Sequence, residues 1–227
     1  MIYLSTGGFK TQPASVTVKH LAENEFLTIE LSGGVYEDDQ LRKLRDLQKQ
    51  YDIIFKVHNY FPPPLKPFVF NLGSLNKEIA SLSIQHVKNS IEYSVELGSD
   101  VYSFHAGFLL DPGVSELGVT IANRRLYDRA EAMKVFLERV NFLAEYALSN
   151  NVSFLIENNV VSDSNYKQFS GDPLLMTGKN ECEYIMENTP DNVNLLVDVA
   201  HLKVSAQSVG FDAVSFVDAA NDNFLLD

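Results

Sequence analysis

The 227-residue chain lacks the features that would place it in several common classes of protein. Its only cysteine, Cys182, has no partner for an intrachain disulfide, which suits a reducing compartment. Only 18 basic residues stand against 30 acidic ones, and the formal net charge of −12 repels nucleic-acid backbones. No stretch approaches the roughly 18 uncharged apolar residues of a membrane span, and no basic leader opens the chain. We therefore expect a soluble, cytoplasmic protein.

The glycine fingerprint of dinucleotide-binding folds is also missing, since only Gly7-Gly8 follows the first apolar run. The chain does have 45% hydrophobic residues, enough to form one substantial core. Strand and helix patterns alternate along it without a break in composition. This continuity predicts a single domain over residues 1–227.

Short apolar runs of the kind that parallel sheets bury on both faces alternate with amphipathic segments. The predicted strands are 2–6, 26–32, 53–58, 101–106, 152–158 and 193–199. The predicted helices are 13–23, 37–50, 77–97, 124–149, about 175–188 and 212–220. The βα order predicts a parallel sheet with right-handed crossovers. Its regular repetition favours a (β/α)8 TIM barrel, a fold of typically about 250 residues.

Groups that can bind a metal ion stand near the carboxyl end of the last apolar run. Residues 193–204 (VNLLVDVAHLKV), which we interpret as a buried strand, contain Asp198 and His201. Removing a carboxylate from water costs several kcal/mol unless it is paired, hydrogen-bonded or bound to a cation. Asp198 therefore needs a partner.

Three earlier strands end in a similar way. Glu157 closes the run 152–158 together with Asn158, while His105 and His58 close two earlier runs. Carboxyl ends of parallel strands meet at one edge of a sheet, where active sites of barrel enzymes lie. Mixed carboxylate and imidazole ligands suit Mn²⁺, Mg²⁺, Co²⁺ or Zn²⁺, and the sequence does not choose among these divalent metals.

The runs FKVHNYF, FNLGSLN, FHAGF, LIENN and VDVAHLKVSA, in this order, resemble the xylose isomerase-like barrel superfamily. The resemblance extends from residue 2 to about residue 210. This superfamily contains sugar (phosphate) isomerases and epimerases and also endonuclease IV-type DNA-repair nucleases. The resemblance implies a divalent metal site that includes Glu157, Asp198 and His201, while His58 and His105 resemble additional ligands of the nuclease branch. The motifs alone leave the branch open.

The acidic composition favours the small-molecule branch. We expect an isomerase or epimerase that moves a proton through an ene-diolate, with Glu157 and His201 as catalytic residues. The expected metal ligands are Glu157, Asp198, His58 and His105, and the expected substrate-binding residues are Asn59, Asn158 and Lys203. The expected partner is a sugar or sugar phosphate, and a homo-oligomer is left open. The alternatives are an endonuclease IV-like phosphodiesterase, a catalytically degenerate barrel, or purely structural roles for these side chains.

The resemblance also implies a His from a seventh strand and a Glu from an eighth, and neither is found in this sequence. Residues 223–227 (NFLLD) are expected to begin strand seven. We therefore expect a barrel truncated after about six βα units, with weaker metal binding and reduced or absent activity.

Overall fold

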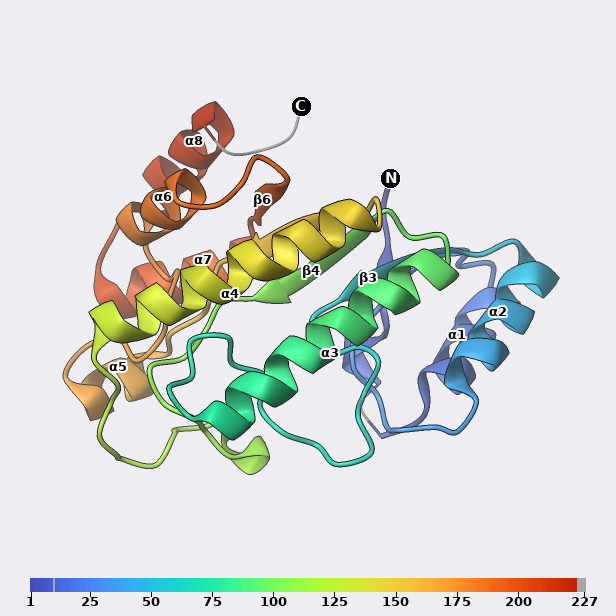
Figure 1. Cartoon of the computed structure of the whole chain (residues 1–227), viewed down its shortest axis with the longest axis horizontal. Coiled ribbons are helices and arrows are strands. Elements are labelled where there is room, and N and C mark those ends of the chain that lie inside the picture. Colours follow the sequence, from blue (N-terminus) through green and yellow to red (C-terminus); the bar gives the residue numbers. More distant parts are fainter. Residues whose placement is uncertain (10, 224–227) are drawn as a thin grey trace. The chain divides into compact units, whose positions relative to one another are not determined.

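The computed structural model describes residues 1–9 and 11–223 and confirms the predicted α/β class (Figure 1). Six parallel strands form one sheet in the sequential order β1 to β6. They are Leu4–Ser5 (β1), Thr28–Leu31 (β2), Ile54–His58 (β3), Val101–His105 (β4), Ser153–Glu157 (β5) and Val193–Leu196 (β6). Sequential parallel order with intervening helices is the strand pattern of a (β/α)8 barrel, as predicted.

Helices alternate with these strands, and the six predicted helices are all present with shifted ends. The helices are Ala14–Glu23 (α1), Gln40–Tyr51 (α2), Lys77–Glu96 (α3), Arg129–Ser149 (α4), Asp163–Phe169 (α5), Lys179–Glu187 (α6), Val199–Val209 (α7) and Ala213–Asn223 (α8). Short 3₁₀ turns cover Thr6–Gly8 and Val114–Glu116. Gly98 has a φ of +66° just after α3, the left-handed conformation in which glycine commonly ends a helix. Within the described residues, no helix has the length and apolar character needed to span a bilayer.

The interpretation of residues 193–204 as one buried strand was wrong. β6 ends at Leu196 and helix α7 begins at Val199, with Asp198 as its N-cap. The Asp198 carboxylate accepts a hydrogen bond from the backbone N–H of His201, which would otherwise lack a partner in the first helical turn. A short apolar run does not by itself distinguish a strand from a helix. His201 therefore lies on a helix and not at a strand end.

Two further differences concern α5 and the end of the chain. The sequence pattern missed α5, since its residues DSNYKQF lack an apolar period, although the hydroxyl of Ser162 caps it by accepting from the Asn165 N–H. The strand predicted to begin at 223–227 falls almost wholly outside the described residues. Asn223 is the last residue of α8, and 224–227 are not described.

The chain divides into two compact units. The first contains residues 1–67, 85–104 and 146–154, and the second contains 68–84, 105–145 and 155–227. The single domain expected from the sequence stays a prediction. In the second unit, α8 lies beside α6 and α7 (Figure 1).

The core of the first unit is built on β2 and β3. Ile29 pairs with Phe55 and Leu31 with Val57 in parallel register, and all four side chains are buried. Helices α1 and α2 lie side by side in this unit (Figure 1). Tyr102, Phe104 and Phe154 add a buried aromatic cluster. The ring centroid of Phe104 lies 5.9 Å from that of Tyr102 and 4.7 Å from that of Phe154. In β2 and β3, every second side chain is buried in the core of this unit.

A buried histidine holds the chain just after β3. Asn59 has a φ of +44°, and its carbonyl accepts hydrogen bonds from Nε2 of His86 at 3.1 Å and from the Tyr102 hydroxyl at 3.0 Å. Burial lowers the pKa of His86 from 6.5 to about 4, although the hydrogen bond to Asn59 acts in the opposite direction. His86 is therefore neutral near pH 7. Because the Asn59 carbonyl is bonded to His86 and Tyr102, the substrate role predicted for Asn59 would fall to its side chain.

We predict that His86 makes the fold sensitive to mild acid. Below pH 6.5 the unfolded chain binds a proton at this ring, while the folded protein does so only near pH 4, so stability falls as pH decreases across this window. The loss attributable to His86 is about 3 kcal/mol. Urea unfolding between pH 7 and 4 should show a shallower pH dependence for His86→Gln, whose amide can still donate to Asn59. His20→Gln, at an exposed position on α1, is the control and should behave as the parent. Equal slopes for all three proteins would contradict the prediction.

Candidate metal centre

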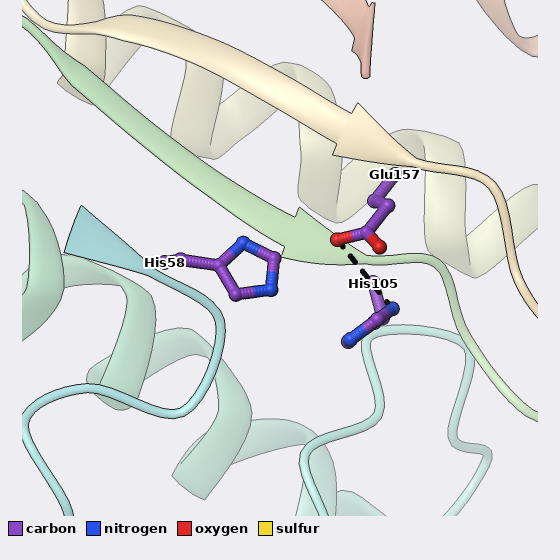
Figure 2. Close-up of side chains that lie close together, drawn as sticks. All are labelled: His58, His105 and Glu157. Carbon is purple, nitrogen blue, oxygen red and sulfur yellow. Dashed lines mark ion pairs between the residues drawn. The ribbon is translucent and has the colours of Figure 1, made fainter. Parts of the chain in front are cut away.

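Strand β5 places a carboxylate among imidazoles at its carboxyl end. Glu157 is 3% exposed, and its Oε1 lies 3.1 Å from Nδ1 of His201. Its Oε2 lies 3.7 Å from Nδ1 of His105, at the end of β4. Figure 2 shows the Glu157 and His105 side chains with their ion pair as a dashed line, and it also labels His58. The two imidazole rings have centroids 5.1 Å apart, so Glu157 faces a pair of histidines.

Asp198 joins this group from the N-terminus of α7. Its Oδ1 accepts from the His201 N–H at 2.8 Å, and its Oδ2 lies 3.7 Å from Nε2 of the same residue. One ligand atom from each of Glu157, Asp198 and His201 lies within 4.8 Å of the others. Two carboxylates and an imidazole at this spacing are a donor set that suits a divalent cation.

The charges around His201 favour its protonated form. Burial alone would lower the pKa of His201, but the hydrogen bond and charge of Glu157, the Asn158 carbonyl 3.0 Å from Nδ1, and the charge of Asp198 together raise it. The proton therefore offsets part of the negative charge of the two carboxylates. A cation that binds through the His201 ring has to displace this proton, so its affinity rises with pH.

The structure thus brings together four of the predicted site residues: His105, Glu157, Asp198 and His201. His58 ends β3 in the first unit, where its Nδ1 lies 2.8 Å from the Ser103 hydroxyl. Its predicted role as a metal ligand stays a prediction.

The three residues predicted to bind substrate differ in their surroundings. Lys203 is exposed on α7, and Asn59 is partly buried after β3. Asn158 is fully buried, and both polar atoms of its amide contact the backbone of Asp198. Substrate binding by these residues stays a prediction.

The sequence reasoning missed Asn71, a buried residue that organises the loops near the site. Its Nδ2 donates to the carbonyls of Phe108 and Leu110 and to the carboxylate of Asp111, at 2.9 to 3.1 Å. Its Oδ1 accepts from the backbone N–H groups of Gly73 and Phe108. The contact to Gly73 is a local Asx turn, and the segment NLG is a turn signal that could have identified it.

The sequence profile of the family described as "Xylose isomerase-like TIM barrel" matches residues 18–224. The chain belongs to this family. The resemblance noted in its motifs is thereby confirmed. The comparison with curated protein sequences gives no match.

Solved structures with the same fold include enzymes of two kinds. A D-tagatose 3-epimerase-like protein matches 91% of this chain with a TM-score of 0.64 and 18% identity. An L-ribulose 3-epimerase matches 89% with a TM-score of 0.65 and 15% identity. An AP endonuclease of family 2 from Brucella melitensis matches 95% with a TM-score of 0.61 and 14% identity. The chain spans 66%, 62% and 74% of the lengths of these three proteins, and at such identities the likeness establishes the shared fold.

We predict that Glu157→Gln lowers the pKa of His201 in the metal-free protein. The substitution keeps the size of the side chain but removes the charge that opposes the effect of burial. Titration of the His201 ring signals by NMR measures this change. Glu187→Gln, an exposed change of equal charge on α6, is the control and should leave the pKa unchanged. An unaltered His201 titration in Glu157→Gln would rule out the proposed coupling.

Proposed function

We propose that this protein is a metal-dependent isomerase or epimerase of a sugar or sugar phosphate. The observation that carries the proposal is the buried carboxylate of Glu157, which faces His105 and His201. Asp198, the N-cap of α7, has a ligand atom within 4.8 Å of those of Glu157 and His201. An epimerase-like protein and an epimerase of known structure share the fold, which makes this class of reaction a candidate. Because the fold supports many chemistries, the choice among them rests on the side chains of the site.

Glu157, Asp198 and His105 are the proposed metal ligands, and His58 is proposed as a further ligand from the sequence resemblance. Their oxygen and nitrogen donors suit Mn²⁺, Mg²⁺, Co²⁺ or Zn²⁺. A divalent metal bound there would supply Lewis-acid stabilisation of the negative charge that develops in an ene-diolate.

The protein's own groups would move the proton. Glu157 is the proposed base, taking the proton from the carbon beside the substrate carbonyl and returning it. Its two oxygens face different histidines, which allows one to serve as a ligand while the other accepts the proton. His201 is proposed to hydrogen-bond a substrate oxygen, and Asn59 and Lys203 to bind the rest of the sugar or its phosphate.

Cleavage of DNA is the second candidate, because the fold also resembles an AP endonuclease of family 2. The charge distribution disfavours it. The net charge is −12, and the loop after His105 carries no basic residue before Arg124. The Arg124 guanidinium is itself paired with Glu116 and donates to the carbonyl of Asp111. This loop therefore offers little positive charge to a phosphate backbone.

We predict deuterium incorporation next to the substrate carbonyl. The protein is incubated in D₂O with Mn²⁺ or Co²⁺ and a panel of ketoses and their phosphates, and the products are analysed by NMR and mass spectrometry. Proton abstraction by Glu157 leads to exchange with solvent, which Glu157→Gln should reduce by at least about 100-fold, as expected for loss of a general base. Glu187→Gln should exchange as the parent does.

An abasic-site oligonucleotide incubated in parallel separates the alternatives. Its cleavage without any sugar turnover would replace the proposal with the nuclease function. Silence in both assays would instead indicate a catalytically degenerate barrel.

We also predict that metal binding depends on both carboxylates. Asp198→Asn and Glu157→Gln should each weaken Mn²⁺ binding by about 100-fold or more, because loss of a ligand costs more than loss of an outer hydrogen bond. Isothermal titration at pH 7.5 measures the affinities, with Glu187→Gln as the charge-matched control. Equal affinity for the parent and both ligand variants would refute the site.

A further inference from the structure

We infer that Asn158 and Asn159, the asparagine pair, are positioning residues. They fix the positions of the residues around Glu157, which are His105, Asp198 and His201. The inference rests on the proposed function, since it concerns the same site. The pair directly follows Glu157 at the end of β5, the strand between β4 and β6 in the sheet. Asn158 is 0% exposed and Asn159 is 3% exposed, so both amides act inside the protein.

Asn158 connects Glu157 to the start of α7. Its Oδ1 accepts from the backbone N–H of Asp198 at 2.7 Å, and its Nδ2 donates to the Asp198 carbonyl at 3.2 Å. Its own carbonyl lies 3.0 Å from Nδ1 of His201. One residue thus fixes the backbone that carries one proposed ligand and orients the ring of His201.

Asn159 makes the corresponding connection on the other side. Its Nδ2 donates to the carbonyls of Ala106 at 2.8 Å and Gly107 at 3.2 Å, the two residues that follow His105. The same Nδ2 lies 3.0 Å from the carbonyl of Leu175. Three backbone carbonyls therefore converge on one amide, and the chain after His105 is held beside the chain after Glu157.

These contacts are long-range and not the local turns that asparagines usually make. The side chain of Asn158 reaches across 40 residues of sequence and that of Asn159 across 53. A buried amide that bridges strand ends costs free energy when it is removed, because its partners stay buried without it. Metal ligands need their donor atoms within about 0.2 Å of ideal distances. A bridge on each side of Glu157 restricts the movement of the chain segments that carry the proposed ligands.

The arrangement predicts that the two asparagines affect different residues of the site, which a merely structural role would not produce. Removing the Asn158 amide should displace Asp198 and His201 and leave His105 in place. Removing the Asn159 amide should displace His105 and leave Asp198 in place. Asn158 therefore acts on the start of α7, and Asn159 acts on the chain that follows His105.

The first measurement uses the metal-free protein. In Asn158→Ala, the ring signals of His201 in a ¹H–¹⁵N spectrum should shift, while those of His105 stay within the variation seen in a control. In Asn159→Ala the pattern should be reversed. The control is Asn192→Ala, which removes another amide bonded to a backbone carbonyl, that of Ala144, just before β6. If the alanine variants do not fold, Asn158→Ser and Asn159→Ser serve for the same comparison.

The second measurement is titration with Co²⁺, followed by its visible absorption. Asn158→Ala and Asn159→Ala should each weaken binding by about 10- to 100-fold, the usual effect of losing a group that orients a ligand. Asn192→Ala should not weaken it. In the Asp198→Asn background, Asn158→Ala should add little to the loss, because it acts through Asp198, whereas Asn159→Ala should add its full effect.

The outcomes separate the two proposals. If the parent binds no Co²⁺ but the ring signals move as stated, the metal-dependent function fails and the positioning role stands. If Co²⁺ binds and neither asparagine variant alters the ring signals or the affinity, the positioning role is overturned. It is also overturned if each variant shifts both histidines equally.

Discussion

The carboxylate of Glu157 is withdrawn from water at the end of β5, and the surrounding groups are arranged around its charge. An isolated buried carboxylate is strongly disfavoured, so it must be met by cations or hydrogen-bond donors. Here His201 meets one oxygen and His105 faces the other. The raised pKa of His201 is the electrostatic consequence, because the hydrogen bond and charge of Glu157 and the charge of Asp198 favour a proton on that ring despite its burial.

Holding such a group in place requires rigid loops, and these loops are held by amides rather than by apolar packing alone. Asn71 and Asn159 are each buried, and each gathers several backbone groups from loops that follow different strands. Gly107 shows how tight the packing is, since an added Cβ would lie 2.8 Å from Oδ1 of Asn71. Glycine is thus required there by a close approach of chain segments.

The sequence predicted the strands and most helices because their apolar periods are strong, and it predicted His105 and Glu157 at strand ends. It failed at the junction after β6, where an apolar run continues from strand into helix and only the capping role of Asp198 marks the change. It also missed Asn71 as a scaffold and the backbone contacts of Asn158, whose predicted substrate role stays a prediction. Partners of a side chain 40 residues away cannot be seen in a periodic pattern.

The junction between β6 and α7 also explains how one short segment can serve both the fold and the site. Asp198 uses Oδ1 to cap the helix, while its Oδ2 faces the His201 ring. Glu157 likewise turns one oxygen to each histidine. A carboxylate with one oxygen committed to a fixed donor has less freedom to lose when the other oxygen binds a cation. The Asp-x-x-His spacing is therefore a consequence of helix capping geometry as much as of metal chemistry, because a cap bonds the third residue of the helix.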